Sequence, residues 1–66
     1  MKRIATVDKY YIYIFEPCEV VEKGCIYGVI SKFRAECIPF ISSFDMDFYE
    51  YTKYSAIRRA RFLSLL

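Results

Sequence analysis

Residues 10–15, with the sequence YYIYIF, decide the fold, because aromatic and β-branched side chains follow one another there without interruption. Such side chains favour a β-strand, and Glu16-Pro17 ends it. The two faces of this strand are both apolar: one carries Tyr10, Ile12 and Ile14, and the other carries Tyr11, Tyr13 and Phe15. We therefore expect the strand to be central in a sheet or covered on both sides, with a helix over one face.

The segment before this strand is compatible with two structures. Residues 3–7 can form a short strand joined to it by Asp8-Lys9, although this turn lacks the Gly that tight hairpins prefer. One unbroken strand from residue 3 to residue 15 fits the same pattern. The sequence does not separate these alternatives.

The segment after this strand predicts a second hairpin. Residues 18–21 and 25–31 are its strands, and the turn lies at residues 22–24. Gly28 inside a strand indicates a bulge or a close approach of the backbone to another group.

The region from residue 45 to residue 66 predicts a helix, because it contains no Gly or Pro and runs from acidic to basic. The acidic residues are Asp45, Asp47 and Glu50, and the basic residues are Arg58, Arg59 and Arg61. This order suits the helix macrodipole. The N-cap candidates are Ser42, Ser43, Asp45 and Asp47. Asp47 with Glu50 three residues later resembles a capping box.

Helical spacing divides this region into two surfaces. The predicted core stripe comprises Met46, Tyr49, Lys53, Ala56, Ile57, Ala60 and Leu63, with the Lys53 stem lying along the apolar surface. The remaining large side chains are Phe48, Tyr51, Tyr54, Arg58, Phe62 and Leu66. This second, aromatic surface interleaved with arginine exceeds what a helix needs for packing on a sheet.

These elements predict one small α+β domain spanning residues 1–66. A further strand is expected at residues 37–41, and Pro39 places it at a sheet edge because proline cannot donate to a ladder. The expected fold is therefore a small antiparallel sheet of three to four strands within residues 3–41. One C-terminal α-helix packs on one face of that sheet.

Catalysis is not predicted, because the chain lacks histidine and has no glycine-rich phosphate loop. Helix capping explains the acidic residues at positions 45–50 better than an acid and base pair does. We expect no catalytic residue, no metal site and no cofactor. Small aromatic-rich proteins of this length are often accessory factors of phages or mobile elements, which is an analogy from size alone.

The three cysteines, Cys18, Cys25 and Cys37, match neither a zinc site nor a disulfide framework. We expect reduced and mostly buried thiols in a cytoplasmic protein. Asp8 and Lys9 interrupt any signal peptide, and no stretch approaches the ~20 apolar residues of a membrane span. A membrane partner is not expected.

Composition predicts a protein that acts through its surfaces. The chain is 56% hydrophobic and contains 7 Tyr and 6 Phe, more aromatic area than one small core needs. Surplus aromatic side chains and arginine are enriched in interaction hot spots. We expect a non-enzymatic regulator or inhibitor that binds another protein, as a homo-oligomer. The predicted partner-binding residues are Tyr11, Tyr13, Tyr51, Tyr54, Arg58, Arg61 and Phe62.

Two alternatives remain open. The first is a nucleic-acid-binding regulator that uses Lys2, Arg3, Arg58, Arg59 and Arg61 to contact phosphates. The net charge of +2 is modest for such a role. The second alternative is that the surplus aromatic side chains only complete the core of an obligate oligomer.

Overall fold

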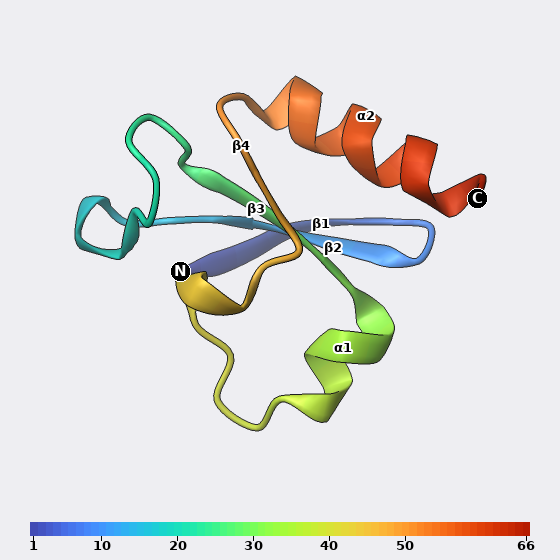
Figure 1. The fold of residues 1–66 in the computed structure, drawn as a ribbon, viewed down its shortest axis with the longest axis horizontal. Coiled ribbons are helices and arrows are strands. Elements are labelled where there is room, and N and C mark those ends of the chain that lie inside the picture. The colour runs from blue at the N-terminus through green and yellow to red at the C-terminus, as the bar shows by residue number, and fades with distance from the viewer.

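The computed structural model describes all residues from 1 to 66 (Figure 1). The strands are β1 (Lys2–Val7), β2 (Tyr10–Ile14), β3 (Tyr27–Ser31) and β4 (Phe48–Glu50), and the helices are α1 (Lys32–Cys37) and α2 (Lys53–Ser64). Short 3-10 helices lie at Pro17–Glu19 and Ser43–Asp45. The sheet order is β1-β2-β3-β4, and every neighbouring pair is antiparallel. The predicted α+β fold with a C-terminal helix is confirmed.

A two-residue turn joins β1 to β2, so the hairpin alternative is correct and the single long strand is not. Asp8 takes the left-handed conformation with φ 52°, which Asp tolerates better than most residues. Val7 then pairs with Tyr10, and the ladder runs back to Lys2 and Ile14. The register shifts between Arg3 and Ala5, which places an irregularity in this edge strand.

Strand β2 is covered on both faces, as its sequence predicts. On one face, Ile12 and Val29 pack against Ala56 and Ala60 of α2, and all four are fully buried. We call this the α2-side cluster. On the other face, Phe15, Ile30 and Met46 form the α1-side cluster, against which Ala35 of α1 packs. Figure 1 shows α2 on one side of the sheet and α1 with its following loop on the other.

The predicted strand at residues 18–21 is wrong. Pro17–Glu19 forms a 3-10 helix instead, and β3 begins only at Tyr27. The local turn is favoured because Pro17 has no N–H for a ladder and the Glu19 carboxylate accepts from the Glu16 N–H at 2.9 Å. The predicted turn does form, since the Cys25 N–H donates to the Glu22 carbonyl at 2.9 Å.

The predicted edge strand at residues 37–41 is also wrong. Helix α1 occupies the preceding residues, and its N-cap Ser31 accepts from the Arg34 N–H at 3.1 Å. The helix ends at Cys37, because Ile38 precedes Pro39 and is therefore restricted to extended conformations. The fourth strand comes instead from β4, where Val29 pairs with Phe48.

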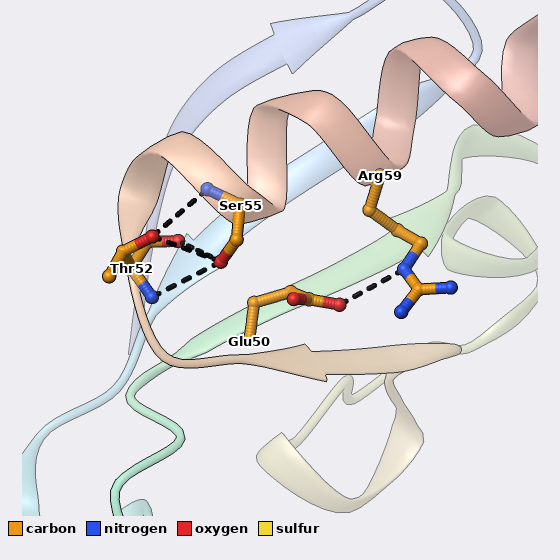
Figure 2. Close-up of polar contacts among 4 residues, drawn as sticks. All are labelled: Glu50, Thr52, Ser55 and Arg59. Atoms are coloured by element: carbon orange, nitrogen blue, oxygen red, sulfur yellow. Dashed lines mark hydrogen bonds and ion pairs between the residues drawn. The ribbon is translucent and has the colours of Figure 1, made fainter.

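Helix α2 starts later than its charge pattern predicts, and none of the four predicted residues caps it. Its N-cap is Thr52, whose hydroxyl accepts from the Ser55 N–H at 3.0 Å (Figure 2). The Thr52 N–H donates in return to the Ser55 hydroxyl at 3.3 Å. The predicted cap Asp47 lies before β4 and accepts from the Ser31 N–H at 2.9 Å and from the Arg34 guanidinium.

The predicted core stripe is correct for Ala56, Ile57 and Ala60 of α2 and wrong for the residues before the helix. Ala56 and Ala60 are fully buried, and Ile57 packs against them in the α2-side cluster. Met46 and Tyr49 precede the helix and belong to the α1-side cluster, on the opposite face of the sheet. Two other side chains also depart from the prediction, because Lys53 is exposed and Phe48 packs against the α2-side cluster.

Candidate functional site

The side of α2 that faces away from the sheet carries Tyr54, Arg58 and Phe62 in one row. Residues four apart lie one above another on a helix, so the three side chains are neighbours. Tyr54 is 69% exposed and Phe62 is 60% exposed. The guanidinium carbon of Arg58 lies 5.6 Å from the centroid of the Tyr54 ring, within the range of a cation–π contact.

Two shallow grooves flank this row, and its three side chains line both of them. The groove toward β4 has a volume of about 330 Å³ and is completed by Glu50, Ser55 and Arg59. The groove on the other side of the row has a volume of about 550 Å³ and is completed by Ile57, Arg61 and Leu65. We call Tyr54, Arg58, Arg61, Phe62 and Leu65 the outer surface of α2.

Arg59 is adjacent in sequence to Arg58 but is engaged within the protein. Its Nε donates to the Glu50 Oε2 at 3.0 Å (Figure 2). Its guanidinium carbon also lies 4.6 Å from the centroid of the Phe48 ring. Arg59 therefore ties α2 to β4.

The remaining basic side chains of α2 have no acidic partner. Lys53, Arg58 and Arg61 make no ion pair, and α2 contains no Asp or Glu. The outer surface thus combines unpaired positive charge with exposed aromatic and aliphatic side chains.

Different roles for the two neighbouring arginines lead to a stability prediction. We expect Arg59→Ala to lower the free energy of unfolding by about 1 kcal/mol, through loss of the exposed ion pair and the Phe48 contact. Arg58→Ala should change it by less than about 0.5 kcal/mol. Urea unfolding followed by circular dichroism measures both. Equal losses in the two variants would contradict the assignment.

The structure separates the other predicted partner-binding residues from this surface. Tyr11 and Tyr13 are half-buried and pack against the α1-side cluster, on the face of the sheet opposite α2. Tyr51 precedes α2 and lines neither groove. Its ring lies against Gly24, where an added Cβ would be 2.9 Å from the ring.

The basic residues of the nucleic-acid alternative do not form one patch. The guanidinium carbon of Arg3 lies 4.2 Å from the ring centroid of Tyr11, so it is on the face opposite α2. Lys2 is exposed at the start of the edge strand β1. With Arg59 held by Glu50, only Arg58 and Arg61 of that set lie together on the outer surface of α2.

Several exposed side chains were missed at the level of sequence. Leu65 is 85% exposed and lines a groove, and its helical spacing from Phe62 and Arg61 could have revealed it. Phe33, Phe40 and Phe44 are also largely exposed, although Phe40 was expected in a strand. No sequence signal distinguishes these three side chains from core phenylalanines.

The prediction of mostly buried cysteines is wrong. Cys25 is buried, whereas Cys18 and Cys37 are exposed, and all three are free. Burial raises the pKa of the Cys25 thiol, with a further contribution from the Glu22 charge. No group of three or more Cys, Asp or Glu side chains is placed to hold a metal ion.

This difference in exposure predicts how the thiols react. Near pH 8, we expect Cys18 and Cys37 to react rapidly with an aromatic disulfide reagent, whereas Cys25 should react only after unfolding. The reason is that burial and a raised pKa both lower the amount of accessible thiolate. Absorbance of the released thiol gives the rates. Three equally fast thiols in the folded protein would show that Cys25 is accessible.

None of the helices is long and apolar enough to cross a membrane. No family model matches the chain, and no curated protein or solved structure is significantly similar to it.

Proposed function

We propose that the protein is a non-enzymatic regulator or inhibitor that acts by binding another protein through the outer surface of α2. The observation that carries this proposal is the exposed row of Tyr54, Arg58 and Phe62, with a groove on each side. Tyrosine and arginine are the residue types enriched in binding hot spots. Exposed aromatic side chains grouped on one surface are typical of interaction sites.

Capture from cell lysate tests this proposal. Tagged protein is incubated with lysate in two arms, one of them treated with nuclease, and bound proteins are identified by mass spectrometry. We expect at least one protein that survives nuclease treatment and is lost with Arg58→Ala. A capture profile that is unchanged in Arg58→Ala would contradict the proposed surface.

We further propose that the protein forms a homo-oligomer. Phe33, Phe40 and Phe44 are 79%, 92% and 78% exposed, which adds to the apolar area outside α2. Burial of such area at an interface between copies would stabilise so small a core. Analytical ultracentrifugation at micromolar concentration should give at least twice the chain mass of 7.9 kDa. A single species at 7.9 kDa would contradict the oligomer.

Nucleic-acid binding is the second candidate, and the unpaired Arg58 and Arg61 favour it. It is weaker because Arg3 and Arg59 are engaged with Tyr11 and Glu50. Binding driven by phosphates must weaken as salt increases, by an amount that grows with the number of contacts. Titration of duplex and single strands at two salt concentrations tests this candidate, and affinity independent of salt would exclude it.

A further inference from the structure

We infer that the partner presents an acidic amphipathic segment to the outer surface of α2. Carboxylates of this segment pair with Arg58 and Arg61, and an apolar side chain enters the groove beside Phe62. This inference rests on the proposed function and adds to it the chemistry of the partner.

Charge complementarity is the first argument. The basic residues of α2 are Lys53, Arg58, Arg59 and Arg61, and only Arg59 is neutralised within the protein, by Glu50. Of the three unpaired cations, Arg58 and Arg61 are three residues apart on the helix and line the same groove, so they form the positive part of the outer surface. The planar guanidinium of arginine can donate two parallel hydrogen bonds to a carboxylate, so acidic side chains of a partner match Arg58 and Arg61.

The shape and apolar character of the surface are the second argument. The groove of about 550 Å³ is lined by Ile57, Phe62 and Leu65 as well as by Arg58 and Arg61. Apolar and basic groups therefore alternate along the same groove. An amphipathic segment matches this pattern, because it places apolar anchors at helical spacing and charged residues beside them.

A nucleic acid fits this surface less well. Ile57 and Leu65 line the groove next to Arg58 and Arg61. These aliphatic side chains cannot form hydrogen bonds or ion pairs with the phosphates of a nucleic acid. The other cations proposed for phosphate contacts are distributed over both faces of the sheet. An acidic amphipathic segment of a protein can pair its carboxylates with the arginines and pack its apolar side chains against Ile57 and Leu65.

Selection from an unbiased display library of random 16-residue peptides tests this inference. The immobilised baits are the wild-type protein and Arg58→Glu, with Lys23→Glu as a control that changes the net charge equally on an exposed turn. We expect enriched peptides to be net acidic and to contain Leu or an aromatic residue. Their affinity, measured by fluorescence anisotropy, should fall at least about tenfold for Arg58→Glu and stay within about twofold for Lys23→Glu.

Each result distinguishes this inference from the proposed function. Enriched peptides that are neutral or basic, or no enrichment at all, would overturn the acidic partner. Tighter binding of duplex or single-stranded nucleic acid than of any enriched peptide, with the same loss in Arg58→Glu, would overturn it in favour of phosphate recognition. The proposed function is contradicted by a different result, which is lysate capture that is unchanged in Arg58→Ala. Arg61→Glu serves as a second test variant should Arg58→Glu not show the circular dichroism of the wild type.

Discussion

Ile12→Ala should remove a large fraction of the free energy of unfolding of the protein. Ile12 lies at the centre of the sheet, is fully buried, and contacts α2 through the α2-side cluster. Loss of a buried isoleucine to alanine costs about 2 to 5 kcal/mol. A domain of this length has a total stability of only about 3 to 10 kcal/mol. One cavity therefore removes a large fraction of the stability.

Urea unfolding followed by circular dichroism measures the effect, with Ile26→Ala as the matched control. Ile26 is exposed and precedes β3, so the same substitution should cost less than about 1 kcal/mol there. A loss below about 1 kcal/mol for Ile12→Ala would mean that α2 does not close over this part of the sheet.

Gly28→Val should have a similarly large effect for the opposite reason, because it overfills the other face of the sheet. A Cβ at Gly28 would lie 2.5 Å from the Met46 Cγ and 2.6 Å from the Phe15 Cζ, and both side chains are buried. Overpacking a core costs about 1 to 3 kcal/mol for small additions. We expect Gly28→Ala to fall in that range and Gly28→Val, which adds two more methyl groups, to exceed it.

A double-mutant cycle with Met46→Ala tests the cause. If contact with Met46 is responsible, the loss in Gly28→Ala with Met46→Ala should be smaller than the sum of the two single losses. A Gly28→Ala variant as stable as the wild type would show that the backbone is not closely approached here. In that case, the close approach that the sequence offers for Gly28 as an alternative to a bulge would be wrong.

The sequence predicts the parts of the fold that depend on local pattern. The uninterrupted aromatic and β-branched run at residues 10–15 identifies a strand that is covered on both faces, and the spacing of Ala56 and Ala60 identifies the buried side of α2. The first feature follows from residue types within a short run, and the second follows from helical periodicity. The turn at Asp8 is only one of two alternatives in the sequence, although Asp tolerates the left-handed conformation that the structure shows there.

The parts that the sequence did not predict depend on non-local pairing. Phe48–Glu50 has only three residues and is not separated from α2 by Gly or Pro, so its sequence reads as part of the helix. Its strand structure comes from pairing with β3, about twenty residues earlier in the chain. Asp47 likewise resembles a helix cap, whereas its carboxylate is held by Ser31 and Arg34.

The candidate site divides in the same way. Helical spacing places Tyr54, Arg58 and Phe62 in one row from sequence alone. The separate role of Arg59 could not be predicted, because it depends on Glu50 lying on a strand beside the helix and not on the helix itself. Strand alternation places Tyr11 and Tyr13 on the face opposite Ile12, but the sequence does not show that α2 covers the Ile12 face.

The central claim is that the outer surface of α2 is the surface that binds a partner protein. The most direct test compares lysate capture by wild type, by the double variant Tyr54→Ala with Phe62→Ala, and by Phe40→Ala, in which an exposed aromatic side chain is removed outside α2. All variants are first checked by circular dichroism and thermal unfolding. We predict that the double variant loses the partner while it remains folded, and that Phe40→Ala retains it. Full capture by the folded double variant would contradict the claim.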